Sequence, residues 1–173
     1  EEETTQKIIE YLEENAEFFD GIVISDFVYG VITPKLLLSL RNIAKRENIY
    51  LFGDLQCSSQ VGDISKMKDF FLLSPNEKEA RIALKDKDSG LETICQELIK
   101  TTRTDGLIIT LGAEGLIAFD CKNNNKIIRQ AFPSLSVNPI DVAGAGDSLL
   151  AIISTFISSG SSLMDAAAIG CCI

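Results

Sequence analysis

The segment from Asp141 to Ser148, Asp-Val-Ala-Gly-Ala-Gly-Asp-Ser, combines two glycines with two carboxylates and leads into an apolar stretch. Gly144 and Gly146 allow backbone φ values that are closed to other residues and let a ligand approach without a Cβ in the way. At a helix start, the N–H groups of Ala145, Gly146 and Asp147 would point outward together. Such amides, with the helix dipole, form an anion site that can hold a phosphoryl group. Asp147 would lie beside that site.

Two other patterns contain residue types suited to nucleotide chemistry. They are Asn76-Glu-Lys-Glu79 and Thr110-Leu-Gly-Ala-Glu-Gly115. Each has an ordinary structural explanation when taken alone. Asn76 is a plausible helix cap followed by a first-turn acid, and the second pattern is a plausible hairpin turn. A glycine turn before a helix is also common by itself, so the order of the three motifs along the chain is what favours a shared function.

Composition sets limits on the class of protein. The 173 residues are 46% hydrophobic, enough for one domain or a large part of one. No apolar stretch approaches the roughly 20 residues of a membrane span, and the acidic start is unlike a signal peptide. A net charge of −9 argues against nucleic acid or an anionic membrane surface as a partner. A homodimer is compatible with these features.

The residue types that the chain contains further limit the catalytic and metal sites it can form. The chain has no histidine, which excludes Ser-His and Cys-His nucleophile systems and makes a zinc site improbable. The five cysteines lack a Cys-x-x-Cys pattern and include the neighbours Cys171 and Cys172. They are typical of reduced thiols packed as small apolar groups, so the expected compartment is the cytoplasm.

Helical and strand patterns alternate along the chain. Helices are expected at 5–19, 34–46, 76–84 and 91–101, the last capped by Asp88, and strands at 22–24, 49–52, 67–73 and 107–111. A hairpin of 116–119 with 126–129 follows, and two helices close the chain, the second capped by Ser162 with Asp165 in its first turn.

This alternation predicts an α/β fold whose mostly parallel sheet is covered by helices on both faces. Ligands on such sheets gather at the carboxyl ends of the strands. The polar residues that stand there are Ser25-Asp26, Asp54, Asn76 and the 110–115 turn.

In that order, the three motifs resemble those of the ribokinase-like, pfkB-type carbohydrate kinases. The resemblance runs from about Gly21 to the C-terminus and implies ATP-dependent phosphorylation of a sugar hydroxyl. It implies a three-layer αβα fold with an antiparallel hairpin on its C-terminal side.

The resemblance also assigns roles to residues. Asp147 would be the base that faces the acceptor hydroxyl, and the amides of Gly144, Ala145 and Gly146 would form the anion hole. Further assignments concern the cofactors: Asn76 and Glu79 would organise Mg²⁺ through water, Thr110, Gly112 and Gly115 would line the ATP site, and Asp141 would lie beside a monovalent cation, K⁺. No Walker sequence occurs, so Mg²⁺ and backbone amides must act in place of a P-loop lysine.

A narrower resemblance is to the heptose-phosphate kinases of bacterial ADP-heptose synthesis. It rests on Ser25-Asp26-Phe27-x-x-Gly30, on the Thr33-Pro34 helix start and on Asp54. It implies substrate roles for Asp26 and Asp54, although both are equally explained as strand-end acids satisfied by neighbouring amides. Tyr29 and Leu55-Gln56 replace the subgroup's Lys and Pro-Lys, so two cations suited to a phosphorylated acceptor are missing. The acceptor is therefore a sugar or a sugar phosphate, and nucleoside and aminoimidazole-type acceptors stay open.

The family pattern contains parts that this chain lacks, namely an N-terminal portion and a small β lid. Residues 1–173 are therefore expected to be a single partial domain, the nucleotide-binding and catalytic portion of a carbohydrate kinase, and to be inactive in isolation.

Parts of the sequence are compatible with two other functions. The missing lysines also suit a catalytically silent nucleotide-binding or assembly module of the same fold. A dinucleotide-binding oxidoreductase would explain Gly144-x-Gly146, but Leu149 stands at the third glycine position and too few residues follow for a βαβ unit.

Overall fold

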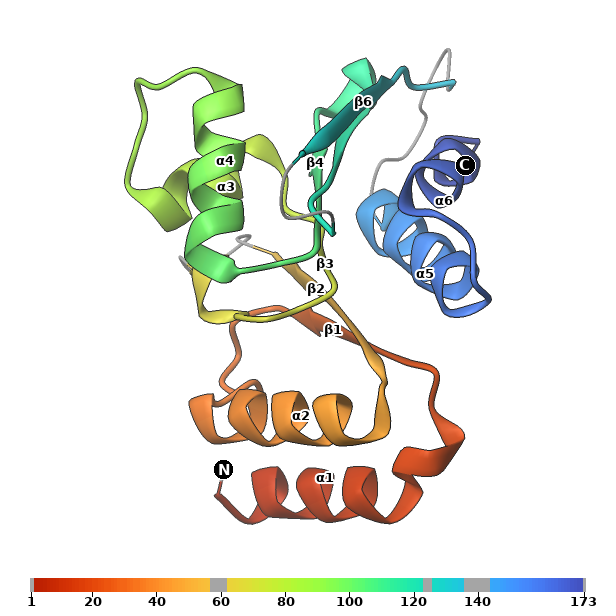
Figure 1. The fold of residues 1–173 in the computed structure, drawn as a ribbon. Helices are drawn as coiled ribbons and strands as arrows, with labels where there is room; N and C mark the ends of the chain where they lie inside the picture. Colours follow the sequence, from red (N-terminus) through yellow and green to blue (C-terminus); the bar gives the residue numbers. More distant parts are fainter. Residues whose placement is uncertain (1, 57–61, 123–125, 136–143, 173) are drawn as a thin grey trace.

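The core of the molecule is a six-stranded sheet whose strands follow one another in chain order (Figure 1). The first four strands are parallel, and the last two are antiparallel to their neighbours. The strands are β1 (Gly21–Asp26), β2 (Tyr50–Leu55), β3 (Leu72–Leu73), β4 (Gly106–Thr110), β5 (Leu116–Asp120) and β6 (Ile128–Phe132). The computed structural model describes residues 2–56, 62–122, 126–135 and 144–172.

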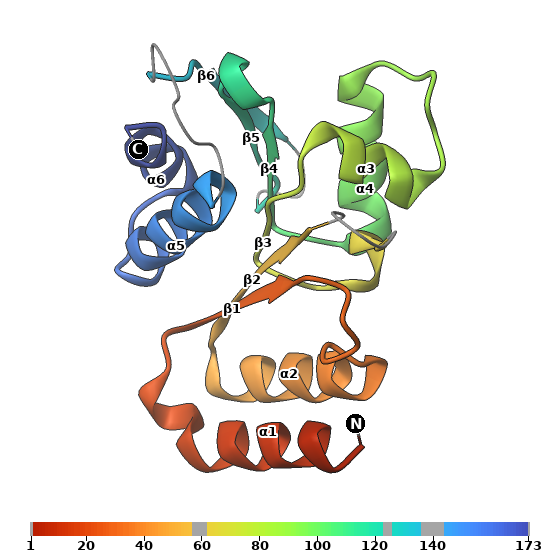
Figure 2. The same ribbon diagram turned by 180° about the vertical axis from the view of Figure 1, so that it is seen from behind.

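Helices cover both faces of this sheet, as Figures 1 and 2 show from opposite sides. One apolar cluster joins the sheet to α1 (Glu2–Asn15), α2 (Pro34–Glu47), α3 (Glu77–Leu84) and α4 (Leu91–Thr102). The other cluster joins the opposite face to α5 (Ala145–Ser158) and α6 (Leu163–Gly170). The predicted three-layer αβα architecture is confirmed. Within the described ranges, no helix is long and apolar enough to span a bilayer.

Local sequence explains where the helices begin and end. Thr33 accepts a hydrogen bond from the Leu36 N–H at 3.2 Å, and Pro34 occupies the first turn of α2, where its missing N–H costs nothing. Asn48 ends that helix in the left-handed conformation that asparagine tolerates. Ser162 caps α6 by accepting from the Asp165 N–H at 3.1 Å, as predicted.

Side-chain alternation in β1 and β2 decides which residues face which layer. Ser25 is paired in register with Asp54, so their side chains lie on one face of the sheet, while Asp26 and its partner Leu55 lie on the other. Phe52 packs in the cluster with α5, and Leu55 packs in the cluster with α2. Ser25 and Asp54 therefore point toward the α5 layer, and Asp26 points away from it.

Three predicted elements are wrong in detail. The strand expected at 67–73 is reduced to Leu72–Leu73, because Asp69 adopts a left-handed φ of 60° that interrupts extended backbone. Gly90, not Asp88, is the N-cap of α4, since the Asp88 N–H bonds to the Asp86 carboxylate at 3.0 Å in the preceding turn. The second hairpin strand begins at Ile128 and ends at Phe132, later than the expected 126–129.

The remaining differences are small. The 110–115 turn contains a short 3₁₀ helix, η3 (Gly112–Glu114). The first helix ends at Asn15 and continues as η1 (Ala16–Phe18), and a third 3₁₀ turn, η2 (Ile64–Lys66), precedes β3.

Candidate active site

The Asp147 carboxylate lies where α5 meets the carboxyl ends of β1 and β2. Its Oδ1 accepts a hydrogen bond from the Ser25 hydroxyl at 3.0 Å, and its Oδ2 accepts one from the Gln56 side-chain amide at 3.0 Å. The Gln56 backbone N–H donates to the Asp26 carbonyl at 2.9 Å, which extends the β1–β2 ladder by one bond. Two strand ends therefore hold one carboxylate at a helix start.

The first turn of α5 is open toward solvent. Gly144 is its N-cap, with a left-handed φ of 78°, and has no side chain to satisfy the first N–H groups. Ala145 and Gly146 are exposed, and a Cβ built on Gly144 or Gly146 would meet no atom of the described residues within 4 Å. Since the first N–H groups of a helix have no intrahelical acceptor, those of this turn are available to an anion.

Asp54 is a buried carboxyl beside two other acids. Burial, then the charge of Glu79 and more weakly that of Asp147, raise its pKa to about 7 from an ordinary value of 3.8, against a lowering by the Leu55 amide. Its side chain is only 7% exposed. Negative charge therefore gathers between the starts of α3 and α5.

Asp26 lies in a different environment. Its Oδ1 accepts from the Val28 N–H at 2.8 Å, its Oδ2 forms an ion pair with Lys66, and it is buried on the face opposite Ser25. Both carboxylate oxygens are thus satisfied by the protein. These contacts match the structural alternative for Asp26, in which neighbouring groups satisfy a strand-end acid.

Asn76 and Glu79 form a reciprocal cap at the start of α3. The Glu79 N–H donates to Asn76 Oδ1 and the Asn76 N–H donates to Glu79 Oε2, both at 2.9 Å. The pair therefore has a structural task, and it also places the buried Glu79 carboxylate near Asp54.

A depression of about 310 Å³ brings together three of the residues expected to bind nucleotide. These are Asn76, Thr110 and Gly112, joined by a bridge between Asn76 and Thr110 and lined further by Lys78 and Glu114. Gly115 is not part of this lining. Its φ is 97° and a Cβ there would lie 2.1 Å from the Phe132 carbonyl oxygen, so the hairpin itself requires glycine.

The predicted metal sites have less support from the geometry than the other assignments. Among the described ranges, no three acidic or cysteine side chains converge closely enough to ligate one ion directly. Asp141, expected beside a monovalent cation, lies outside the described residues.

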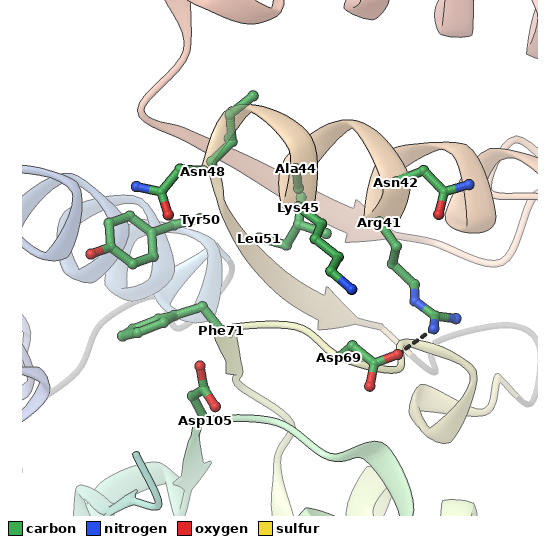
Figure 3. A pocket seen from close by; sticks show the side chains of 11 residues that line it. Arg41, Asn42, Ala44, Lys45, Asn48, Tyr50, Leu51, Asp69, Phe71 and Asp105 are labelled. Atoms are coloured by element: carbon green, nitrogen blue, oxygen red, sulfur yellow. Dashed lines mark ion pairs between the residues drawn. The ribbon is translucent and has the colours of Figure 1, made fainter. Parts of the chain in front are cut away.

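A second hollow, of about 630 Å³, lies at the opposite end of the sheet (Figure 3). Tyr50, Phe71 and Asp105 stand at the starts of strands there, beneath Lys45 of α2. Its Asp69 is occupied by a two-bond contact from Arg103 at 2.6 and 2.7 Å, and by Arg41. This hollow lies at the amino ends of the strands and is separate from the candidate active site. Ligands of parallel α/β sheets gather at the carboxyl ends instead.

Comparison with known proteins identifies the family. Residues 1–173 match the family described as pfkB family carbohydrate kinase. The chain belongs to the pfkB family of carbohydrate kinases. Among curated proteins, this pfkB-family chain is similar to the bifunctional protein HldE of Trichlorobacter lovleyi, with 32% identity over 166 residues that cover 94% of the chain and 32% of that protein. HldE of Aliarcobacter butzleri is 33% identical over 156 residues, covering 88% and 30%. The chain thus spans about a third of the length of these relatives.

Solved structures share the fold. Phosphofructokinase-2 from Escherichia coli in complex with potassium has a TM-score of 0.75 at 20% identity, covering 94% of this chain and 53% of that one. Arabidopsis thaliana ribokinase complexed with ribose and ATP has a TM-score of 0.70 at 18% identity, covering 91% and 49%. The ribokinase-like fold predicted for this pfkB-family chain is confirmed.

The sequence alone did not predict which face of the sheet each strand-end residue occupies. Lys66 was not singled out, and only the fold brings it against Asp26. The link from Gln56 to Asp147 was missed as well, although a signal existed: Phe52, Asp54 and Gln56 alternate onto one face of β2 and its extension.

Proposed function

We propose that this chain carries the phosphotransfer site of a kinase that moves the γ-phosphoryl group of ATP to a hydroxyl of a sugar or sugar phosphate. Membership of the pfkB family supports the reaction class. The observation that carries the proposal for this site is the position of Asp147, held at the strand ends beside an open helix start.

The chemistry follows from this arrangement. The acceptor hydroxyl gives its proton to the Asp147 carboxylate as its oxygen forms a bond to the γ-phosphorus. The bond from that phosphorus to the bridging β–γ oxygen breaks, and ADP leaves. Because the transition state is loose, positioning and charge stabilisation matter more than base strength, so a carboxylate suffices. The amides of Gly144, Ala145 and Gly146 hold the oxygens of the migrating group.

The residues present fit Mg²⁺ and ATP. Asp54 and Glu79 are both buried, and the charge of Glu79 contributes to the raised pKa of Asp54, so a divalent cation would relieve the repulsion between them. Asn76 and Glu79 would hold Mg²⁺ through water, and the ion would neutralise charge on the phosphates. Thr110 and Gly112 would contact the nucleotide, Gly115 would shape the turn that carries Gly112, and Asp141 would lie by K⁺.

The proposed acceptor is a heptose phosphate, with other sugars and sugar phosphates as alternatives. Similarity to the HldE proteins supports a heptose phosphate as the acceptor. Gln56 stands where the heptose-phosphate kinase pattern has a lysine, and this difference weakens the proposal. The proposed partner is the small-molecule acceptor, with no nucleic acid or membrane, and the proposed location is the cytoplasm, where cysteines stay reduced.

The test is turnover by the full-length protein. With ATP and Mg²⁺, ADP release should depend on adding a heptose phosphate or another sugar from a broad panel, and the product should carry a new phosphate by mass spectrometry. ATP binding without turnover across the panel would favour the catalytically silent module instead.

A further inference from the structure

We propose that Gln56 and Ser25 are positioning residues that orient the Asp147 carboxylate toward the acceptor hydroxyl. The inference rests on the proposed function, because it assigns these two side chains a task in that same site. Its basis is that each oxygen of Asp147 accepts a hydrogen bond from a different strand end, Oδ1 from Ser25 and Oδ2 from Gln56, each at 3.0 Å.

Both donors extend from hydrogen-bonded backbone. Ser25 lies within β1 and is paired in register with Asp54, so its side chain points to the same face of the sheet as that of Asp54. Gln56 follows β2, and its N–H bonds to the Asp26 carbonyl at 2.9 Å. The backbone at both positions is therefore held by the hydrogen-bond ladder of the sheet, which is where a positioning side chain is most precise.

Two donors on opposite oxygens define the plane of the carboxylate. A single hydrogen bond would leave the group free to turn about its Cβ–Cγ bond, whereas one bond to each oxygen opposes that rotation. Each carboxylate oxygen keeps further acceptor capacity, so an alcohol can still donate its proton to Asp147. Small errors in the placement of a catalytic group lower the rate by large factors. Holding the Asp147 carboxylate in one orientation should therefore increase kcat.

The Gln56 amide orients the carboxylate without bringing a positive charge. A lysine there would also donate a hydrogen bond, but it would place a cation against Asp147. The surroundings already contain the carboxyls of Asp54 and Glu79, whose charges act on one another. Either donor would orient the Asp147 carboxylate, so the hydrogen bond, not the charge of the donor, is what this site requires at position 56.

The experiment compares substitutions at position 56 in the full-length protein. Gln56→Leu keeps most of the volume and removes the donor, and it should lower kcat about tenfold with the KM for ATP unchanged. Gln56→Lys restores a donor and should recover most of that loss. Gln96→Leu, on the exposed surface of α4, is the matched control and should leave kcat unchanged.

A packing role would give the opposite ranking, with Leu tolerated and Lys harmful, and that result would overturn the inference. Equal kcat for wild type and Gln56→Leu would overturn it as well. Ser25→Ala should lower kcat similarly, and Ser25→Thr, which retains the hydroxyl, should restore it.

A crystal structure of full-length Gln56→Leu separates this inference from the proposed function. The Asp147 carboxylate should rotate away from its wild-type orientation, and an unchanged orientation would overturn the inference. Absence of turnover in the wild-type protein would instead refute the proposed function, and the orientation of Asp147 would still decide the role of Gln56.

Discussion

Helices α3 and α5 both begin near the carboxyl ends of the strands, but their first turns are satisfied in opposite ways. At α3, Asn76 and Glu79 bond to each other's backbone N–H groups, so the protein caps the helix itself. At α5, Gly144 offers no side chain, and among the described residues nothing lies against Gly144 or Gly146. A helix start that no described side chain caps is available to a ligand anion.

The acids of the two helices differ accordingly. Glu79 is buried and folded back onto its own helix start, while Asp147 reaches across to Ser25 and Gln56 on the sheet. Both acids lie in a first helical turn, so this position alone does not identify a catalytic acid. What distinguishes Asp147 is a carboxylate held by two strand ends, beside a first helical turn that no described side chain caps.

The largest effect is expected from Asp147→Asn. This change removes the proton acceptor and keeps the shape, so kcat should fall about 1000-fold, within the range for general bases. The ATP Kd from calorimetry should stay unchanged. Asp165→Asn is a matched control in the first turn of α6, and it should retain full kcat. A kcat for Asp147→Asn equal to wild type would remove the base assignment.

The pH dependence of stability should report the crowded acids between the two helices. The pKa of Asp54 is raised to about 7 in the folded protein. The folded state therefore binds more protons than the unfolded state between about pH 4 and pH 7, and the free energy of unfolding contributed by this group falls as pH rises through that window, by up to about 4 kcal/mol.

Asp54→Asn should remove that part of the dependence. Urea unfolding at pH 5 and pH 8 should show a smaller loss of stability in the variant than in the wild type. The same loss in both proteins would mean that Asp54 has an ordinary pKa.

Alanine at Gly144 and at Gly146 should separate backbone strain from ligand access. Gly144→Ala places a Cβ at a φ of 78° and should lower the free energy of unfolding by about 1 to 2 kcal/mol. Gly146→Ala lies in helical backbone with open space around it, so it should raise stability by about 0.5 to 1 kcal/mol. Its kcat should nevertheless fall, because the added methyl group obstructs the approaching phosphate. Full activity in Gly146→Ala would show that no ligand approaches there.

The smallest effect is expected from the α3 cap. Asn76→Ala removes the acceptor for the Glu79 N–H and should cost about 1 kcal/mol in chemical denaturation, while Asn76→Ser should retain most of that stability. If Asn76→Ala left stability unchanged, the reciprocal cap would not be a structural feature, and the contrast with α5 would lose one side.

Much of the fold could be predicted because its signals are local. Thr33-Pro34 and Ser162 each cap a helix by contacts within three residues, and the alternation of helices and strands defines the parallel sheet. The strand predicted at 67–73 was wrong for most of its length. The apolar side chains of this run are buried, but Asp69 has a left-handed backbone conformation that interrupts an extended strand.

The candidate site was predictable only in part. The three motifs identify the strand ends and the glycine turn, but spacing gives no side-chain direction across distant segments. Ser25 and Asp147 are 122 positions apart, and Gln56 and Asp147 are 91 apart, so their contacts depend on how α5 packs on the sheet. Asp26 and Asp54 looked equivalent in sequence, yet strand alternation places them on opposite faces.

The most direct measurement is a crystal structure of the full-length protein with Mg²⁺ and a non-hydrolysable ATP analogue. The account predicts that the γ-phosphate lies within hydrogen-bonding distance of the first-turn amides of α5, with the Asp147 carboxylate facing it across the acceptor space. A γ-phosphate bound away from that turn, or an Asp147 side chain directed elsewhere, would contradict the account.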